Sequence, residues 1–513
     1  MTAILPGGSQ EDANTEIRVT RPILSLAMLA VGSLLVGFSM GSWLAPLAAW
    51  VGPVFVLRYA RDYPARRGYL LVVVATTLAT FIGFGGVWSD RGPVMVAALT
   101  IGFGILWSLP YLADRLLSAR LAGFAGTLVF PLAMTSIDFA IMRVSPLGAW
   151  GAMGFTQYGN LSLMQLASVT GMTGIAFLMG WFASVANWTW ERRAIGIGRG
   201  PAVFGAVLAA VFVFGFWRLN LAPAVDSTIR VAGITAGHGP DLGKAVEEAP
   251  DHAAGLKAIE AHREAYFSAT AREAEAGARV VVWPEVAGAG FESTEAAFIA
   301  RAGKVAAEHG IYLAVPLFTF GDDGFRPDGS KLIKNKLLVF DPNGAIVIEH
   351  VKYGGRISEG YREQGDGILR TVTTPFGVLG GLICYDMDYP AIVEQAGLNG
   401  TGLMLDPSAD WQDIDPTHTY MAVFPAIENG MSVVRQTDGG LSMAVDPYGR
   451  VLAQVDFFGS TDRTMVAQVP TAHVATIYTA FGRWFGWVCM VGFLLVVAYV
   501  VARALIARRV TGI

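Results

Sequence analysis

The heptapeptide Gly380-Gly381-Leu382-Ile383-Cys384-Tyr385-Asp386 ends a short apolar run with a thiol. A strand that delivers a lone Cys to a sharp turn places a nucleophile at the strand end, where the following backbone N–H groups can face a developing oxyanion. Free Cys is also a common small hydrophobe of core strands, so the heptapeptide by itself leaves both interpretations open. The rest of the chain has to decide between them.

The composition is that of a membrane protein. Of the 513 residues, 53% are hydrophobic and 15% are charged, against about 25% charged in ordinary soluble domains, and the mean hydropathy is +0.48. The net charge of −4 gives no sign of a nucleic-acid partner. The two cysteines, Cys384 and Cys489, lie far apart and do not predict a disulfide framework.

Eight apolar stretches come close to the roughly 20 residues that cross a bilayer as a helix. They lie at 23–40, 43–57, 68–87, 93–112, 121–142, 166–188, 201–217 and 484–502. The first two are short and closely joined, so a hairpin or one re-entrant unit is an alternative to two spans. We predict a cytoplasmic tail (1–22), a bundle of about seven spans (23–220), a globular domain (229–469), a last transmembrane helix (484–505) and a second tail (506–513).

The arginines between these stretches predict the orientation. Fourteen lie in the two tails and in the loops after the second, fourth and sixth stretches, whereas the short loops of the opposite side carry Arg91 and Arg143. Basic loops stay in the cytoplasm, so both tails are predicted inside and the globular domain outside. The first twenty residues are polar and of mixed charge, so no cleavable signal peptide is expected.

Two polar features fall among the apolar stretches. Asp138 would be costly against lipid, so we expect it to face protein and make a structural hydrogen bond, with a catalytic role as the alternative. The glycine-rich segment from Gly154 to Gln165 is interpreted, taken alone, as an ordinary outside loop.

Residues 229–469 alternate predicted strands with predicted helices. Strands are expected at 229–235, 279–283, 311–320, 336–340, 345–349, 377–383, 403–405, 432–436 and 441–445, and helices at 253–277, 292–309 and 422–429. The turn sequences Asp-Pro-Asn-Gly (341–344) and Asp-Pro-Tyr-Gly (446–449) each join two strands into a hairpin. The pattern predicts a layered α/β domain with a mixed sheet.

Three ionisable side chains stand at predicted strand ends in this domain. Glu285 follows the strand 279–283, Lys352 follows the apolar run 345–348, and Cys384 follows Leu382 and Ile383. Together a carboxylate could take the thiol proton, and an ammonium could hold the thiolate and the oxyanion while the sulfur attacks an acyl carbon. Taken singly, Glu285 and Lys352 would more often be surface residues. The combination favours an acyl-transfer site.

These residues resemble a known family. Trp283-Pro284-Glu285, Lys352 after a hairpin, and Ile383–Asp386 resemble the Glu-Lys-Cys triad of the nitrilase, or carbon-nitrogen hydrolase, superfamily. Ala426–Gly430 and Val433–Arg435 are similar to the helix and strand after that family's cysteine. Eight spans with the globular domain exported between the last two look like apolipoprotein N-acyltransferases, whose membrane half the segments 154–157, 165–167 and 171–174 also resemble.

The resemblance implies a multi-pass α-helical membrane bundle and an extracytoplasmic αββα sandwich in a bacterial cytoplasmic membrane, with the catalytic domain on the periplasmic face. It implies Glu285 as general base, Cys384 as nucleophile, Lys352 as stabiliser of thiolate and oxyanion, and Tyr385 and Asp386 at the oxyanion or substrate site, the Tyr385 N–H completing the oxyanion hole. A phospholipid would acylate Cys384 and leave as lysophospholipid. The α-amino group of a diacylglyceryl-cysteine lipoprotein would then receive the acyl chain, without a cofactor.

The chain departs from the family pattern after the lysine. Lys352 is followed by Tyr353-Gly354-Gly355-Arg356, and only 32 positions separate it from Cys384, so the family's long arm is shortened or replaced. The second acidic residue of the family is expected at Glu359, with Glu363 as the alternative. Asp386 stands where the family has Glu. These changes concern the acceptor more than the triad.

Two other functions stay open. The first is a membrane-anchored amidohydrolase on a small or lipid amide, in which water resolves the acyl-enzyme. The second is a transport or scaffold protein with a degenerate domain, which the intact Glu-Lys-Cys set disfavours. An apolar lid would favour a lipid donor, and its candidate rim residues, with core packing as the alternative, are Trp411, Tyr420, Phe457 and Phe458. No metal site is expected, because the seven histidines show no ligand-like spacing.

Overall fold

The computed structural model describes residues 22–63, 65–89, 92–193, 196, 198–221, 227–236, 242, 248–249, 252–321, 333–354 and 362–511. The chain divides into two compact units. The first comprises Met1–Ile137, Ala176–Leu208 and Trp487–Ile513, and the second comprises Asp138–Ile175 and Ala209–Gly486. The globular domain predicted at 229–469 lies inside the second unit, which also takes in a segment from the apolar half of the chain.

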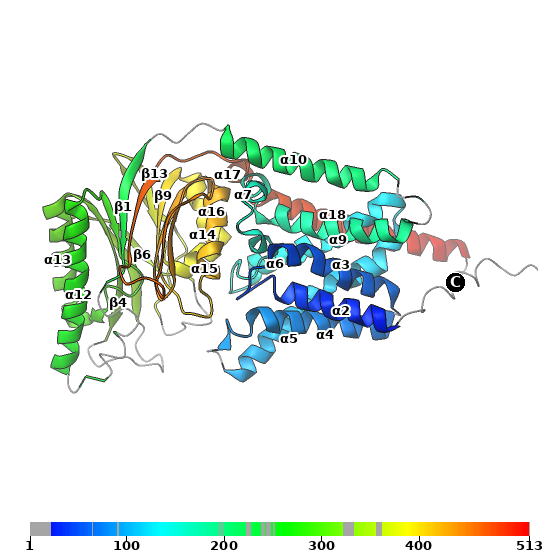
Figure 1. Cartoon of the computed structure of the whole chain (residues 1–513), viewed down its shortest axis with the longest axis horizontal. Helices are drawn as coiled ribbons and strands as arrows, with labels where there is room; N and C mark the ends of the chain where they lie inside the picture. Colours follow the sequence, from blue (N-terminus) through cyan, green and yellow to red (C-terminus); the bar gives the residue numbers. More distant parts are fainter. Residues whose placement is uncertain are drawn as a thin grey trace, which may run out of the picture. The chain divides into compact units, whose positions relative to one another are not determined.

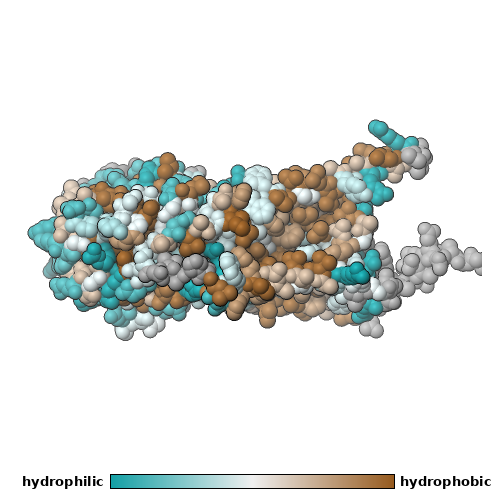
Figure 2. Space-filling model, turned by 90° about the horizontal axis from the view of Figure 1, so that it is seen from above, coloured by the Kyte–Doolittle hydropathy of each residue, from teal (hydrophilic) through white to brown (hydrophobic). Residues whose placement is uncertain are grey.

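Apolar helices form the first unit and continue into the second. They are α2 (Pro22–Gly37), α3 (Pro46–Asp62), α4 (Ala65–Phe84), α5 (Pro93–Leu117), α6 (Val129–Val144), α9 (Met172–Arg192), α10 (Gly200–Asn220) and α18 (Trp484–Thr511). Figure 2 shows apolar side chains over much of the visible surface of these helices, and a more polar surface over the α/β domain.

Four of the described helices are long and apolar enough to cross a membrane: Pro93–Arg120, Gly123–Val144, Gly200–Asn220 and Trp484–Ala507. A fifth candidate is the pair Leu161–Thr170 and Met172–Arg192, which is bent by 116°. The apolar helices Pro22–Gly37 and Gly68–Phe84 are shorter. Length and composition thus support four or five spans, and the count of eight stays a prediction.

Small residues let two helices of the first unit approach closely. A Cβ added at Gly32 of α2 would lie 2.8 Å from Val56, and one added at Gly52 of α3 would lie 2.8 Å from Val36. Such close approach of small residues is how apolar helices pack where lipid supplies no hydrophobic driving force. A larger residue at either glycine would push α2 and α3 apart.

The α/β domain consists of two packed sheets. The first has the order β13-β1-β2-β4-β5-β6, with β3 beside β4, and the second has the order β12-β11-β10-β9-β8-β7. The strands of the first are β1 (Thr228–Ile234), β2 (Val280–Val282), β3 (Gly290–Phe291), β4 (Tyr312–Phe320), β5 (Lys334–Phe340), β6 (Ile346–Val351) and β13 (Thr464–Pro470). Those of the second are β7 (Arg370–Thr374), β8 (Gly377–Gly381), β9 (Thr401–Ala409), β10 (Ser432–Asp438), β11 (Leu441–Val445) and β12 (Val451–Asp456).

Helices cover the outer face of each sheet, giving four layers (Figure 1). The first sheet carries α12 (His252–Glu275) and α13 (Glu292–His309), and the second carries α14 (Pro390–Leu398), α15 (Thr417–Met421) and α16 (Val423–Asn429). Strand β2 shows why the layers form, because Val281 packs among the helix-facing residues while Val280 and Val282 pack between the sheets. Alternate side chains of a strand point to opposite faces. All three are fully buried, so both faces of the sheet need a cover.

Strand direction brings four strand ends together. β2 and β4 are parallel, β5 is antiparallel to β4, and β6 is antiparallel to β5, so β6 runs in the direction of β2. In the second sheet β8 and β9 are parallel neighbours. The residues that follow β2, β6, β8 and β9 are those that build the site described below.

The segment 145–175 is part of the second unit and is not an ordinary outside loop. Its helical turn Met153–Gln157 is buried throughout, and Asp138 accepts a hydrogen bond from the Met153 N–H (3.4 Å). Asp138 is 1% exposed, as expected for a structural rather than lipid-facing carboxylate. The loop interpretation was wrong because burial by a distant domain leaves no local signal in the sequence.

A hydrogen bond ties this segment to the α/β domain. Glu428 in α16 accepts a hydrogen bond from the backbone N–H of Met172 (2.8 Å), the first residue of α9, from 256 positions further along the chain. Gly171, just before it, has φ +67°, and a Cβ there would lie 2.7 Å from Tyr478. The bend therefore needs glycine, and the carboxyl group of Glu428 caps the helix that starts after it.

Candidate active site

Glu285 and Lys352 form a buried pair. The Lys352 Nζ donates to Glu285 Oε1 (2.5 Å), the Asn335 Nδ2 donates to the same oxygen (2.7 Å), and the Ala409 N–H donates to Oε2 (3.2 Å). Glu285 is 3% exposed and Lys352 is 2% exposed. The structure thus brings together the acid after β2 and the ammonium after β6, which the sequence placed at strand ends.

Cys384 follows β8 and starts the short 3-10 helix η7 (Cys384–Asp388). Its φ is +50°, and Val286, next to Glu285, has φ +71°; these are the non-glycine residues with positive φ in the described parts of the chain. Such backbone is uncommon for side-chain-bearing residues and tends to occur at functional sites. The prediction of a sharp turn at the thiol is confirmed.

The Cys384 thiol is buried among charged groups. Its Sγ lies 3.8 Å from the Ala409 carbonyl oxygen and 4.0 Å from Asp410 Oδ1. Burial raises the pKa of the Cys384 thiol well above its usual value, and the carboxylates of Glu285 and Asp410 raise it further. The cations Lys352 and Arg435 act in the opposite direction. The neighbouring charges therefore set how readily the thiolate forms.

Asp386 fixes the turn that carries the thiol. Its Oδ1 accepts from two of the backbone N–H groups that follow Lys352 (3.0 and 2.6 Å), and its Oδ2 accepts from the Ile383 N–H (3.2 Å) and lies 2.7 Å from His350 Nε2. Against the effect of burial, the hydrogen bond and charge of His350 lower the pKa of Asp386. These contacts favour a positioning role for this carboxylate.

Tyr385 lies against the segment 145–175. Its ring stacks on Trp150 with centroids 5.7 Å apart, and its hydroxyl donates to the Leu147 carbonyl (3.1 Å). Trp150 also lies 4.8 Å from the ring of His418. The Tyr385 side chain is therefore held by the segment 145–175, for which the sequence predicted no role in the site.

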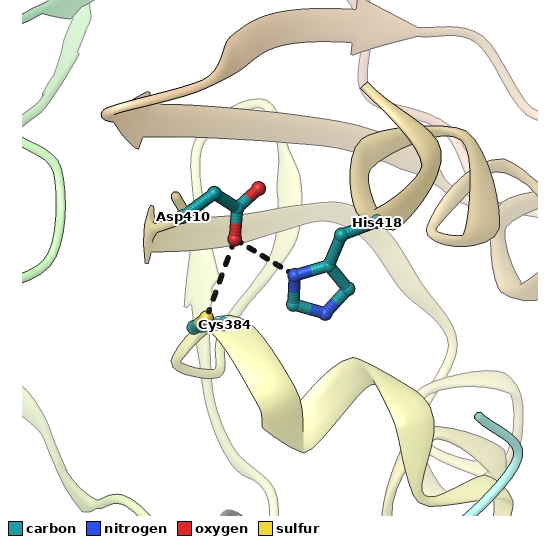
Figure 3. A group of neighbouring side chains, drawn as sticks. All are labelled: Cys384, Asp410 and His418. Atoms are coloured by element: carbon teal, nitrogen blue, oxygen red, sulfur yellow. Dashed lines mark hydrogen bonds and ion pairs between the residues drawn. The ribbon is translucent and has the colours of Figure 1, made fainter. Parts of the chain in front are cut away.

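A second cluster adjoins the thiol (Figure 3). Asp410, directly after β9, lies 2.7 Å from His418 Nδ1, and the other ring nitrogen of His418 lies 2.9 Å from Asp388. The Arg435 Nη2 donates to Asp410 Oδ1 (3.1 Å), and its Nη1 donates to Asp406 (2.6 Å). Five ionisable side chains thus meet in the interior beside Cys384.

For Asp410 and His418, burial opposes the charge, and the charged partners outweigh the effect of burial. The charges of His418 and Arg435 lower the pKa of Asp410 to about 2. Asp410 and Asp388 raise the pKa of His418 to about 9. Near neutral pH, Asp410 is therefore a carboxylate and His418 is an imidazolium.

Cys384, Asp410 and His418 also have the donor atoms of a metal site, within 4.8 Å of one another. The Arg435 Nη2 lies 2.9 Å from His418 Nδ1, so a cation between these donors would meet a guanidinium. The sequence could not predict that these three donor atoms lie together, because the three residues belong to three different elements. The expectation of no metal stays a prediction.

The remaining sequence candidates differ in exposure. Glu359 lies outside the described residues, and its alternative Glu363 is exposed. Of the proposed apolar rim, Trp411 is 39% exposed and Phe458 is 53% exposed, Phe457 is buried, and Tyr420 stacks on Tyr158. Trp411 directly follows Asp410, whose Oδ1 lies 4.0 Å from the Cys384 sulfur.

Comparisons with known proteins cover both parts of the chain. The carbon-nitrogen hydrolase family matches residues 230–478, and the N-terminal domain of apolipoprotein N-acyltransferases matches residues 32–185. The apolipoprotein N-acyltransferase of Geobacter metallireducens is 24% identical, covering 73% of this chain and 74% of that protein. That of Agrobacterium fabrum is 25% identical, covering 83% and 78%. An amidase structure from Nesterenkonia sp. shares 22% identity, covering 47% of this chain and 90% of the amidase with a TM-score of 0.36.

Proposed function

We propose that this chain transfers a fatty acyl chain from a phospholipid through a Cys384 thioester to the N-terminal amine of a diacylglyceryl lipoprotein. Its matches to the carbon-nitrogen hydrolase family and to the N-terminal domain of apolipoprotein N-acyltransferases support the proposal. One observation carries the proposal: the buried Glu285–Lys352 pair and the thiol of Cys384, in its left-handed turn, follow the carboxyl ends of β2, β6 and β8. Base, cation and nucleophile are the parts that acyl transfer through a thioester requires.

In the first half-reaction Glu285 takes the thiol proton and Sγ attacks the ester carbon of the phospholipid. The negative charge that develops on the carbonyl oxygen is stabilised by Lys352 and by the backbone N–H of Tyr385. When the carbon–oxygen bond breaks, the leaving lysophospholipid oxygen takes the proton from Glu285. The acyl chain stays on Cys384 as a thioester, and Glu285 is again a carboxylate.

In the second half-reaction the neutral amine of the acceptor attacks the thioester carbon. Glu285 takes one proton from the attacking nitrogen, the carbon–sulfur bond breaks, and the thiolate leaves beside Lys352. Glu285 then returns the proton to the sulfur. Product and resting enzyme are an amide and a free thiol.

Intact-mass spectrometry tests this scheme. The purified full chain is incubated with phosphatidylethanolamine alone, and one acyl mass is expected on wild type and none on Cys384→Ala. Adding a diacylglyceryl-cysteine peptide should discharge the mass and yield an N-acylated peptide. Discharge at the same rate without the peptide would indicate water as acceptor, and hence the amidohydrolase. Absence of any acyl mass would overturn both functions.

We also propose that the α/β domain lies on the periplasmic face of a bacterial cytoplasmic membrane, supported by the arginine asymmetry. An alkaline phosphatase reporter fused after Trp217 should be active, and one fused after Arg509 should be inactive. Exchanged activities at these two junctions would contradict the orientation.

A further inference from the structure

The first half-reaction accounts for Glu285, Lys352 and Cys384 but leaves a second carboxylate beside the sulfur without a role. Asp410 Oδ1 lies 4.0 Å from Cys384 Sγ, and the side chain is fully buried. It belongs to a different strand end from Glu285, since it follows β9. A buried carboxylate in contact with a nucleophile calls for a chemical or structural explanation.

The surroundings of Asp410 hold it in one orientation. His418 (2.7 Å) and Arg435 (3.1 Å) both contact Oδ1, and Arg435 also contacts Oδ2 (3.3 Å). His418 is itself held from the far side by Asp388 at 2.9 Å. The carboxylate is therefore preorganised and ionised before any substrate arrives.

The cluster also carries an excess of acids. Three carboxyl groups, those of Asp388, Asp406 and Asp410, face the two cations His418 and Arg435. Among the residues that the structure describes, Asp406 Oδ1 has no hydrogen-bond partner, and burial raises the pKa of Asp406 to about 7. Because the carboxyl groups outnumber the cations, the cluster can accept a substrate that brings a positive charge beside the thiol.

We propose that Asp410 binds the amino group of the acyl acceptor and holds its nitrogen against the thioester carbon. This inference rests on the proposed function and adds which residue recognises the amine. Asp410 would touch the substrate and is in that sense a catalytic residue, whereas His418 and Arg435 are positioning residues that act through it.

The position of the attacking nitrogen favours the acceptor amine over the headgroup amine of the phospholipid donor. The thioester carbon is bonded to Sγ, and an attacking nitrogen must come within about 3–3.5 Å of that carbon. Asp410 Oδ1 lies 4.0 Å from the same sulfur, so an acceptor nitrogen that attacks from the Asp410 side of the thioester comes within reach of this carboxylate. The headgroup amine of a phospholipid donor is separated from its ester carbon by the glycerol and phosphate, so the same geometry does not bring it there.

The protons balance as follows. The acceptor arrives as an ammonium held by Asp410 and loses one proton to water before the attack. Its lone pair then forms the carbon–nitrogen bond, a second proton passes to Glu285, and the carbon–sulfur bond breaks with its electron pair on Cys384. The third proton remains on the amide, and Glu285 reprotonates the thiolate. Asp410 gains and loses no proton.

The test separates the two half-reactions in Asp410→Asn. Thioester formation from phosphatidylethanolamine should stay within about threefold of wild type, while transfer to a diacylglyceryl-cysteine peptide should fall about 10- to 100-fold, as for loss of one charge-assisted hydrogen bond. Discharge by hydroxylamine, a small nucleophile that is uncharged at neutral pH, should change little. Asp366→Asn, which removes an exposed carboxylate paired with Arg370, is the matched control.

Equal losses with the peptide and with hydroxylamine in Asp410→Asn would overturn the proposal, because a merely structural carboxylate would affect both. Failure of the proposed function looks different, since wild type would then form no thioester. If Asp410→Asn does not fold, a competition measurement on wild type tests the same proposal. An N,N-dimethylated acceptor peptide, which keeps a charged N–H but cannot become an amide, should compete with the acceptor better than an N-acetylated one, and equal competition would also overturn the proposal.

Discussion

Glu285 and Asp410 are two buried carboxylates to which we assign different half-reactions, and their partners differ. Glu285 shares its Oε1 between one ammonium and the neutral amide of Asn335, whereas Asp410 is bracketed by an imidazolium and a guanidinium. A carboxylate with a pKa of about 2 is a poor proton acceptor, since an efficient base has a pKa near the working pH. In the proposed mechanism the same functional group therefore transfers protons with one set of partners and supplies a fixed charge with the other.

Removing the Cys384 sulfur has the largest expected effect, because the proposed roles of both carboxylates depend on the thioester. Cys384→Ala should abolish acyl transfer and thioester formation, because the two-step route needs a covalent nucleophile. Cys489→Ala is the control, since that thiol lies in the apolar helix α18 and should leave activity unchanged. Measurable transfer by purified Cys384→Ala would refute the assignment of the nucleophile.

Glu285→Gln tests the proton-transfer side of the comparison. The amide keeps the shape but cannot accept a proton, so the single-turnover rate of thioester formation should fall by about 10²–10⁴. Asp410→Asn, measured in the same assay, should stay close to wild type. A comparable loss of acylation in both variants would show that the two carboxylates do not divide the work as we propose.

The charges around the Cys384 thiol should have a smaller effect, which is a shift of the thiol pKa. The shift should have opposite signs in the two variants Lys352→Met and Asp410→Asn. Lys352 lowers the pKa of Cys384 and Asp410 raises it. The alkylation rate of Cys384 by iodoacetamide, measured against pH in Cys489→Ala, should therefore move to higher pH in Lys352→Met and to lower pH in Asp410→Asn. Profiles that superimpose on wild type would mean that neither charge acts on the sulfur.

The smallest effect concerns stability. The folded pKa of His418 is about 9, above its ordinary 6.5, so its imidazolium contributes stability that is complete below pH about 6.5 and is lost as the pH rises to about 9. The difference in thermal unfolding temperature between wild type and His418→Gln should shrink across this window. A difference that grows toward pH 9 would contradict an imidazolium between Asp410 and Asp388.

The sequence predicts elements whose signal is local. Helix 292–309 is observed as Glu292–His309, and the hairpin expected around 341–344 is the antiparallel pair β5 and β6. Apolar runs place Glu285, Lys352 and Cys384 at strand ends for the same reason. Each of these features depends on hydrophobic pattern and turn residues within a few positions.

The rest of the site comes from contacts between distant parts of the chain. The predicted strand 403–405 is in fact β9 (Thr401–Ala409). Its polar continuation, including Asp406 and Ser408, broke the apolar pattern and hid the fact that Asp410 stands at a strand end. Trp150 gave no signal, because nothing in its own surroundings indicates that it stacks on Tyr385. His418 and Arg435 each look like isolated polar residues until the fold brings them to Asp410.

The cap that Glu428 places on helix α9 has a consequence for how the protein is made. The ribosome completes Met172 long before residue 428 exists, because 256 positions separate the two ends of this hydrogen bond. During synthesis the first turn of α9 therefore lacks this partner at the edge of an apolar segment, and it acquires the cap only after the α/β domain has emerged and folded. The first turn of α9 therefore reaches its capped conformation only once α16 is in place, and a chain truncated before α16 should leave this turn uncapped.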